Sequence, residues 1–590
     1  MKDRYLLIVL LITILVPIGK VAAQSVVFPD DDKERGYYNR PYKRYEAESG
    51  KCSGSALFLN PTYIQTELQS EASNQMAAQL IEKGSFVQWA NDEAADGLTI
   101  RFSLPDGEDG KGTKGTLALY VNNEYVQDIV LDSYWAWQYA LKKGQTYPDN
   151  IPAGNKFARM RFDEMHVRLD RKIPDGGSFK LVKTDDNQIP YTIDFVELEA
   201  VPEAVTFESI QDANKVMYLP SEGRLDQFIA KNGGRTIYIP AGKYDVEERI
   251  SISRPNTKVI GAGMWYTEIY FSASSDNKQT YNKRGIEADA DNIVLEGLYL
   301  NTVNNKRYYN DNSNYQVGKG LMGSFGANSV IKNVWVEHFE CGGWIDGTDR
   351  LRVSHCRFRN NYADGINLSF GSRNSFVEYC SFRNNGDDDM ASWSRGHKMC
   401  EYITYRYCTA ENNWRASSVG FFGGKGHKAQ NLVVIDPMEA GLRVTTDFPG
   451  REFSDEDFIV YDNISVYRAG CPKGILGVSG DIINGSASGA IHITSYLQYD
   501  LHHVKFSNID IFNSKDVAIF IGCKNRKKID QLYLENILID GTQGDGVYFS
   551  RAKGKAFYSN LQFKNVKGKN IGEVSNGFEF STDIKTGLPQ

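Results

Sequence analysis

Beyond residue 18 the sequence contains no long hydrophobic run, no Cys-x-x-Cys pair and no glycine-rich nucleotide-binding fingerprint. These absences argue against a second membrane segment, a zinc site of paired cysteines and nucleotide binding. A surplus of positive charge is also lacking, because 67 Lys and Arg face 74 Asp and Glu, for a net charge of −7. A chain of this charge is a poor partner for nucleic acid, and eight cysteines in 590 residues are too few for a disulfide-built scaffold.

The composition that is present indicates a folded chain rich in strands and turns. Hydrophobic residues make up 41% and charged residues 24%, which supplies a core and excludes general disorder. The 54 Gly, 34 Tyr and 30 Phe favour turns and strands over helices. At about 150 residues per domain the length allows up to about four domains, and two are also reasonable for large all-β units.

The N-terminus has the pattern of a secretory signal peptide. Lys2 and Arg4 precede an apolar run over residues 5–18, and a small-residue cleavage pattern ends at Ala23. We therefore expect a signal peptide at 1–23, a secreted protein (extracellular or periplasmic) and no membrane association after cleavage. An uncleaved anchor is the alternative, although the run is short for a span of about 20 residues. The polar residues 24–42 predict a flexible leader.

Residues 43–201 are predicted to form a β-sandwich of the jelly-roll type. Short alternating runs, such as residues 98–104, 116–121 and 191–198, are separated by Gly, Asp and Pro at short spacing. Residues 202–214 are predicted to be a linker to the rest of the chain.

Residues 215–590 repeat a short β-type phrase with Asn at its corner. The clearest pair is 353–360 (VSHCRFRN) and 377–384 (VEYCSFRN), which align at an offset of 24 residues. So short a period predicts a parallel β-helix, in which stacked coils bury one continuous core. A β-propeller is the rival architecture, but its blades need about 40–50 residues. Cys356 and Cys380 would then stack on adjacent coils, as buried thiols rather than a disulfide.

Three aspartates lie at one-coil spacing in this repeat. In the 24-residue register Asp388 falls at the position of Asp364, with Asp387 beside it. Adjacent strands are about 4.8 Å apart, so the carboxylates should crowd together on one outer face, where their repulsion raises one pKa. A protonated carboxyl beside an ionised one is what acid–base hydrolysis of a glycosidic bond requires. Solvated turns or a calcium cluster are the alternatives.

Several motifs of this region resemble those of glycoside hydrolase family 87, which contains α-1,3-glucanases and mycodextranases. They are residues 363–368 (ADGINL), 371–378 (GSRNSFVE), 386–391 (GDDDMA), 421–424 (FFGG) and 441–448 (GLRVTTDF). The resemblance implies a right-handed parallel β-helix. It also implies endo-hydrolysis of α-1,3-glucosidic bonds, with inversion, in α-1,3-glucan or mixed α-1,3/α-1,4-glucan.

The same resemblance implies roles for the aspartates. Asp364, Asp387 and Asp388 match the catalytic aspartates of the family. By analogy with other β-helix hydrolases, Asp387 is the expected general acid, and Asp364 and Asp388 are expected to hold the attacking water. Asp389 stands where the family pattern has a small residue, so it is expected to add a charge. No cofactor is expected for catalysis.

The N-terminal unit resembles carbohydrate-binding modules of families 6 and 35. The motifs are residues 45–49 (YEAES), 84–89 (GSFVQW) and 193–197 (IDFVE). Modules of this kind often hold a structural calcium ion, and Glu46, Glu48 and Asp194 match those ligand positions with the oxygen donors that calcium prefers. The alternative is a sandwich that only packs on the β-helix.

Trp393, Trp414 and His397 follow the aspartates and are candidate substrate contacts, because aromatic faces serve as sugar platforms. Core packing of the tryptophans and a structural histidine are the alternatives. Two other functions remain open: a polysaccharide lyase, which needs a Lys, Arg or His base, and a non-catalytic glycan-binding solenoid. The expected partner is an α-glucan polysaccharide, and the expected state is a monomer.

Overall fold

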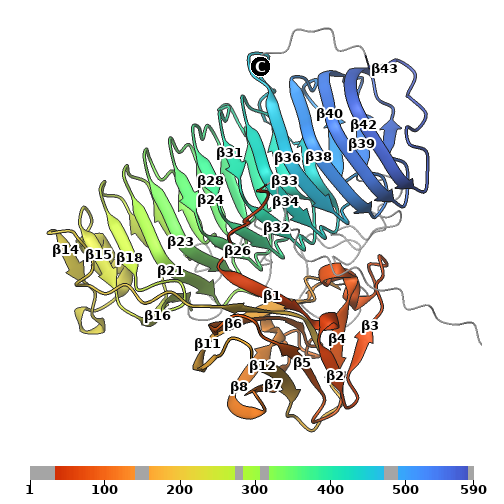
Figure 1. Ribbon diagram of the computed structural model, residues 1–590. Helices are drawn as coiled ribbons and strands as arrows, with labels where there is room; N and C mark the ends of the chain where they lie inside the picture. The colour runs from red at the N-terminus through yellow and green to blue at the C-terminus, as the bar shows by residue number, and fades with distance from the viewer. Residues whose placement is uncertain are drawn as a thin grey trace, which may run out of the picture.

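The computed structural model describes residues 34–139, 158–272, 284–305, 318–448, 450–470 and 489–582. A β-sandwich lies against the side of a long parallel β-helix (Figure 1). This confirms the predicted all-β class and both architectures. The expected signal peptide at 1–23 lies outside the described residues. Among the described residues the α-helix α1 (Leu225–Lys231) is short, and no helix is long and apolar enough to cross a bilayer.

The sandwich consists of two antiparallel sheets around a core that includes Leu98, Leu119, Phe179 and Val196. The inner sheet contains β1 (Tyr42–Glu46), β3 (Leu57–Leu59), β4 (Ala77–Leu80), β6 (Ala95–Ser103), β11 (Asp163–Ile173) and β13 (Tyr191–Glu199). The outer sheet contains β2 (Lys51–Ser53), β5 (Phe86–Ala90), β7 (Lys114–Val121), β8 (Glu124–Asp132) and β12 (Ser178–Lys183). A separate short pair is formed by β9 (Gln138–Tyr139) and β10 (Ala158–Arg159).

The β-helix is built from two long parallel sheets. The eleven-stranded sheet contains β17 (Ile250–Ile252), β20 (Ile286–Ala288), β22 (Leu321–Gly323), β24 (Gly343–Asp346), β27 (Ile366–Ser369), β30 (Met390–Trp393), β33 (Ser417–Phe422), β35 (Ala440–Thr445), β37 (Ile491–Ser495), β39 (Ile519–Cys523) and β41 (Val547–Ser550). The nineteen-stranded sheet contains β14 (Lys215–Met217), β15 (Thr236–Ile239), β16 (Gly242–Val246), β18 (Lys258–Gly261), β19 (Thr267–Phe271), β21 (Val294–Thr302), β23 (Val330–Glu337), β25 (Arg352–Ser354), β26 (Arg357–Arg359), β28 (Phe376–Glu378), β29 (Ser381–Arg383), β31 (Thr404–Arg406), β32 (Thr409–Glu411), β34 (Lys428–Ile435), β36 (Ile459–Tyr467), β38 (Val504–Ser514), β40 (Ile529–Thr542), β42 (Gly554–Val566) and β43 (Phe578–Ser581).

The 24-residue offset read from the sequence is the register of the stacked coils. Phe358 pairs with Phe382 across β26 and β29, and their rings stack with centroids 5.2 Å apart. Cys356 and Cys380 lie one above the other in the core as free thiols, with the Cys356 N–H 3.4 Å from the Cys380 sulfur. Both predictions for this pair of coils are therefore confirmed.

The recurring Asn residues turn the chain at one corner of each coil. Asn360, Asn384 and Asn412 have φ values of 54°, 57° and 50°, a left-handed conformation that Asn adopts more readily than other non-glycine residues. The Asn384 side-chain amide donates to Asn360 Oδ1 at 2.8 Å, and Asn361 donates to Asn385 Oδ1 at 3.0 Å. These residues therefore also tie successive coils together.

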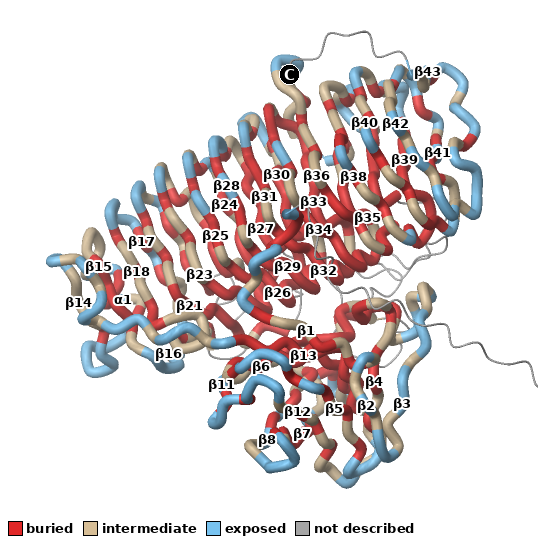
Figure 2. Tube along the Cα trace, in the orientation of Figure 1, coloured by how far each residue is buried: buried red, intermediate tan, exposed pale blue. Residues whose placement is uncertain are grey.

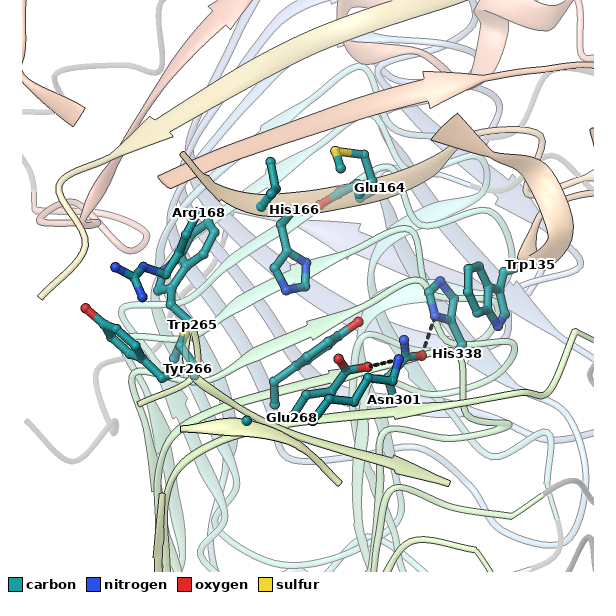
Figure 3. Close-up of a pocket in the computed structure, with 15 residues that line it drawn as sticks. Trp135, Glu164, His166, Arg168, Trp265, Tyr266, Glu268, Asn301 and His338 are labelled. Atoms are coloured by element: carbon teal, nitrogen blue, oxygen red, sulfur yellow. Dashed lines mark hydrogen bonds and ion pairs between the residues drawn. The ribbon is translucent and has the colours of Figure 1, made fainter. Parts of the chain in front are cut away.

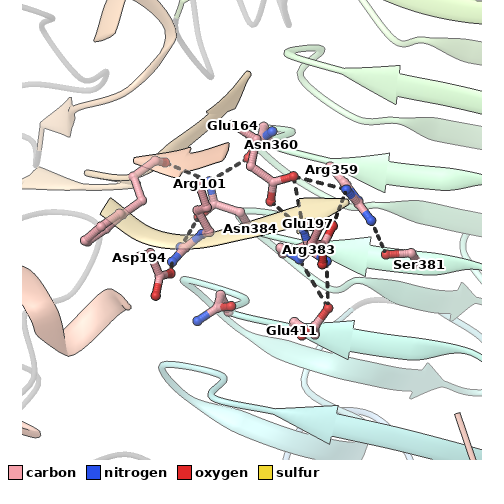
Figure 4. Close-up of polar contacts among 12 residues, drawn as sticks. Arg101, Glu164, Asp194, Glu197, Arg359, Asn360, Ser381, Arg383, Asn384 and Glu411 are labelled. Carbon is pink, nitrogen blue, oxygen red and sulfur yellow. Dashed lines mark hydrogen bonds and ion pairs between the residues drawn. The ribbon is translucent and has the colours of Figure 1, made fainter. Parts of the chain in front are cut away.

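The sandwich is joined to the β-helix through buried ion pairs. Every residue of β13 is buried, because the solenoid covers the face of the inner sheet that the sandwich core does not (Figure 2). The Arg383 guanidinium of β29 contacts Glu197 of the sandwich at 2.6 Å, Glu164 of the sandwich at 3.0 Å and Glu411 of the solenoid at 3.0 Å (Figure 4). This face of the sandwich is therefore closed to a glycan.

The end of the predicted leader is packed rather than flexible. Arg35 is 4% exposed and forms an ion pair with Asp510 at 2.6 Å, and the Tyr37 N–H donates to Thr409 Oγ1. The prediction of a flexible leader is thus wrong for residues 34–42, because a buried charge pair and aromatic contacts fix them to the solenoid, whereas residues 24–33 lie outside the described part. In the predicted linker, Asp212 pairs with Lys258 of β18 at 3.1 Å.

Removing the central cation of the buried network should destabilise both units together. In Arg383→Met the carboxylates of Glu164, Glu197 and Glu411 lose their shared partner, and we expect the free energy of unfolding to fall by about 3–5 kcal/mol. Arg171→Met is the matched control, because its pair with Glu124 is exposed and contributes little. Denaturant unfolding measures both, and equal effects of the two substitutions would contradict the assignment.

Candidate active site

The three predicted aspartates meet on one face of the β-helix. Asp364 lies in the turn before β27, and Asp387 and Asp388 lie in the turn before β30. The Gly365 N–H donates to the Asp388 carbonyl at 3.0 Å, which stacks Asp364 and Asp388 on adjacent coils. One carboxylate oxygen of each aspartate lies within 4.8 Å of the others. The crowding expected from the offset is therefore present.

These carboxylates line a pocket of about 260 Å³ with a charged part and an aromatic part. The charged side chains other than the three aspartates are Lys319, Glu340, Arg415, Glu439 and Arg443. The aromatic side chains are Trp344, Trp393, Phe422 and Phe448. Phe448 is 53% exposed and its ring contacts those of Trp393 and Phe422, so the aromatic part is open to a ligand.

Asp387 and Asp388 have different environments although they are adjacent. The Asp387 side chain is 24% exposed and forms an ion pair with Arg415 at 3.0 Å. Asp388 is 5% exposed and accepts a hydrogen bond from the Ser417 hydroxyl. Burial, followed by the neighbouring Asp387 carboxylate, raises the pKa of Asp388 to about 7, although Arg443 and Ser417 oppose the shift. Asp388 therefore holds a proton up to neutral pH.

Asp364 is fixed by the backbone of the next coil. Its Oδ1 accepts a hydrogen bond from the Asp388 N–H at 3.2 Å, and its Oδ2 accepts one from the Asn367 side chain at 3.4 Å. The side chain is 6% exposed and still lines the pocket. Asp364 is thus held at the floor of the pocket, facing Asp388.

Asp389, which the sequence predicts to add a charge, stands apart from the cluster of three aspartates. Asp389 is fully buried and, unlike the adjacent Asp388, is not among the residues that line the pocket. Its Oδ1 accepts a hydrogen bond from Asn385 at 2.8 Å, and burial raises its pKa well above the usual range. Burial therefore favours the neutral form of Asp389 more than it would for an exposed aspartate.

Of the three predicted substrate contacts, the structure places one in the pocket. Trp393 lines the aromatic part. Trp414 is 3% exposed and packs with Met160, Tyr362 and Met438, so its predicted ligand contact is replaced by a core role. His397 is exposed on a neighbouring turn, edge-on to Phe370, and does not line the pocket. The prediction for these two residues is corrected accordingly.

Sequence reasoning missed the cations of the site. Lys319 pairs with Glu340 at 2.9 Å and lies over the Trp344 ring, and Arg415 pairs with Asp387. Arg443 lies inside one of the motifs that resemble the family, but the motif alone gave it no role. The signal that could have found Arg415 is its position one coil beyond Asp387.

The predicted calcium ligands lie together, and two of them fit a cation. Glu46 and Glu48 each have one buried carboxylate oxygen without a hydrogen-bond partner among the described residues. Burial and the nearby acids raise the pKa of Glu48 to about 7 and that of Glu46 well above its usual range. Asp194 differs, because its oxygens are bound by Arg101 and by the Ser73 N–H. An oxygen-only pair with unpaired atoms suits Ca²⁺.

Family models match nearly the whole described chain. The model of alpha-1,3-glucanase catalytic domain D1 matches residues 39–201, and that of alpha-1,3-glucanase catalytic domain D2 matches residues 219–581. The two matches correspond to the sandwich and the β-helix. No curated protein matches the sequence at a significant level.

Solved structures show the same two-unit fold. The Agl-KA catalytic domain is 31% identical, with a TM-score of 0.81 over 93% of this chain and 98% of its own. The catalytic domain of a GH87 alpha-1,3-glucanase in complex with nigerose is 24% identical, with a TM-score of 0.81 over 93% and 99%. The thermostable GH87 alpha-1,3-glucanase from Streptomyces thermodiastaticus strain HF3-3 is 22% identical, with a TM-score of 0.73 over 92% and 96%.

The pKa of Asp388 predicts a pH-dependent stability. A carboxyl whose pKa rises on folding stabilises the fold fully below its unfolded pKa, near about 4, and this contribution is lost as the pH rises to about 7. The melting temperature of Asp388→Asn should therefore fall less than that of the wild type between those pH values. Asp109→Asn, at an exposed site, serves as the control. If the melting temperatures of the wild type and of Asp388→Asn changed equally with pH, the raised pKa of Asp388 would be contradicted.

Proposed function

The chain belongs to the α-1,3-glucanase family, and we propose that the pocket around Asp364, Asp387 and Asp388 is where it cleaves the glucosidic bond. The protein is a glycoside hydrolase that acts on α-1,3-glucan. One observation carries the assignment of the site: carboxylates from two coils converge within 4.8 Å beside an aromatic wall, and the pKa of one of them is about 7. This pairs an acid with bases at neutral pH.

The attacking water is held between Asp364 and Asp388 at the floor of the pocket. Two acceptors that share one water at about 2.7–2.8 Å lie about 4.5 Å apart, and carboxylate oxygens that lie within 4.8 Å of one another are compatible with this arrangement. In two-carboxylate enzymes, separations of about 5–5.5 Å accompany a covalent intermediate. Here a third carboxylate, Asp387, is present to act as the acid. The short separation of Asp364 and Asp388 is therefore explained by a shared water, and neither carboxylate has to act as a nucleophile. The reaction then inverts the anomeric carbon.

Asp387 delivers the proton to the leaving oxygen. It is the most exposed of the three carboxylates, and a sugar in the pocket would meet it first. In the ligand-free protein the proton resides on the adjacent Asp388. Substrate that displaces solvent from Asp387 raises the proton affinity of that carboxyl, and the proton moves to it as Asp388 becomes the base. Arg415 holds Asp387 in place before the substrate binds.

The remaining wall binds the glucan chain. Trp393, Trp344 and Phe448 offer apolar faces to sugar rings, and Lys319 and Arg443 can donate to hydroxyl groups. Relatives have been solved with nigerose and with tetrasaccharides, which supports a glucan in this pocket. Endo action is part of the proposal and rests on the family resemblance. Secretion is proposed as well, because an insoluble glucan must be met outside the cell and residues 1–23 have a signal pattern.

Reducing-end release from a panel of polysaccharides tests the proposed function. We expect activity on insoluble α-1,3-glucan and on mixed-linkage nigeran, and none on dextran, starch or polygalacturonate. Asp387→Asn should lower kcat by about 10²–10⁴-fold, since a general acid contributes that much. Wild-type kcat should fall as the pH rises through about 7, because the shared proton is lost.

Asp389→Asn is the matched control for these measurements, because Asp389 adjoins the cluster in sequence but is fully buried and does not line the pocket. It should keep near-wild-type activity. An Asp387→Asn protein as active as the wild type would refute the site, and activity confined to polygalacturonate would refute the substrate class.

We also propose that Glu46 and Glu48 hold a structural Ca²⁺, with Asp194 as a nearby acid that is paired with Arg101. The unpaired oxygens of the two glutamates support this, because a buried carboxylate without a partner is costly. The ion would neutralise them beside the joint between the units, where the Asn74 N–H donates to Asp436 of the solenoid.

Removal of calcium should lower the melting temperature at pH 8, and added Ca²⁺ should restore it. Glu48→Gln should abolish the response to EDTA, whereas Glu124→Gln, at an exposed site, should leave it intact. If the site holds no ion, a proton on Glu48 replaces it. In that case the melting temperature would not respond to EDTA and would fall as the pH rises through about 7, the pKa of Glu48.

A further inference from the structure

A second pocket lies at the junction of the two units and shares no lining residue with the active site. This junction pocket has a volume of about 430 Å³, within the range of small-ligand sites. Its sandwich side is formed by Trp135 and residues 164–168, and its solenoid side by residues from four successive coils. Figure 3 shows labelled residues of both sides facing one another. It therefore exists only when the units are docked.

His166 of β11 extends into the junction pocket with unused hydrogen-bonding capacity (Figure 3). Its ring stacks on Trp335 with centroids 3.9 Å apart, and its side chain is 12% exposed. Neither ring nitrogen forms a hydrogen bond with another described residue; the nearest acid, Glu337, is 3.9 Å away. Burial and the Arg357 and Arg359 cations lower its pKa to about 3. The neutral ring thus offers one donor and one acceptor.

Trp265 supplies a second unsatisfied donor in the same place. Its indole N–H is withdrawn from solvent and has no acceptor within the described chain. The indole ring lies edge-to-face with His166 and with Trp335. A pocket whose aromatic walls carry a few unpaired polar atoms is typical of a ligand site.

Of the four Asp, Glu, Lys and Arg side chains that line the junction pocket, all but the exposed Arg168 form ion pairs within the described residues, which favours an uncharged ligand. Lys243 and Glu268 form an ion pair at 3.0 Å, and Glu164 is bound by the buried arginines of the interface. Arg168 lies over the Tyr266 ring at 4.3 Å. A glucosyl unit has hydroxyls that both donate and accept, together with apolar C–H faces, so it complements His166, Trp265 and the aromatic wall.

We propose that the junction pocket is a second, non-catalytic glucan site that holds one segment of an α-1,3-glucan while another segment is cleaved. The identity of the ligand rests on the proposed function, whereas the pocket and its unpaired atoms do not. Such a site increases the local concentration of an insoluble substrate around the enzyme without taking part in the reaction.

The double substitution His166→Phe/Trp265→Phe tests the proposal. It keeps all rings and removes the unpaired nitrogens, so the fold should be as stable as before or more stable. In the inactive Asp388→Asn background, calorimetric titration with an α-1,3-linked tetrasaccharide should show two binding sites. The double variant should weaken one of them about tenfold, because two neutral hydrogen bonds are lost. His397→Phe, at an exposed histidine, is the control.

In the active enzyme, the double variant should hydrolyse insoluble glucan more slowly while its kcat/KM for the soluble tetrasaccharide stays unchanged. Binding curves identical to the control, or stabilisation of the wild type by inorganic phosphate but not by the tetrasaccharide, would overturn the inference. If the wild type cleaves glucan and the double variant binds the tetrasaccharide as the control does, only the proposal for the junction pocket is refuted. A wild type that cleaves no α-1,3-glucan refutes the proposed function.

Discussion

The buried ion pairs between the sandwich and the β-helix are the constraint on which the rest of the structure depends. Arg383 and Arg44 share Glu197 and Glu411, and none of these side chains is more than 3% exposed. Charges this deep cannot remain unpaired, so the two units must fold against each other. Farther along, Arg159 of the sandwich holds Glu439 of the active-site pocket at 3.2 Å. The sandwich thus supports the wall of the site.

The coil repeat places like charges close together, and the acid–base chemistry of the site depends on this proximity. Stacking places Asp388 one coil from Asp364, and the chain adds Asp387 beside it, so three carboxylates occupy a space in which they cannot all ionise. Proton retention at neutral pH is the consequence. The fold tolerates this repulsion because Arg415, Ser417 and the Asp388 N–H each bind one carboxylate oxygen. The acid–base function therefore depends on the stacking of the coils.

The sequence predicted what depends on periodicity and missed what depends on distant contacts. A 24-residue offset identified the solenoid, the thiol stack and the aspartate cluster, because each follows from coil stacking alone. The packing of Arg35, the core position of Trp414 and the burial of Asp389 depend on which elements meet in three dimensions. The buried face of the sandwich likewise depends on its partner, so a short motif there could not distinguish glycan binding from packing.

The central claim is that a water between Asp364 and Asp388 attacks while Asp387 protonates the leaving oxygen. The anomeric configuration of the first product tests this claim most directly. Proton NMR of an α-1,3-linked tetrasaccharide during the first minutes of hydrolysis distinguishes the configuration before mutarotation equilibrates it. The account predicts the β-anomer at the newly formed reducing end, because direct attack by water inverts the α-linkage. Initial release of the α-anomer would show a covalent intermediate on one of the three carboxylates and would contradict the account.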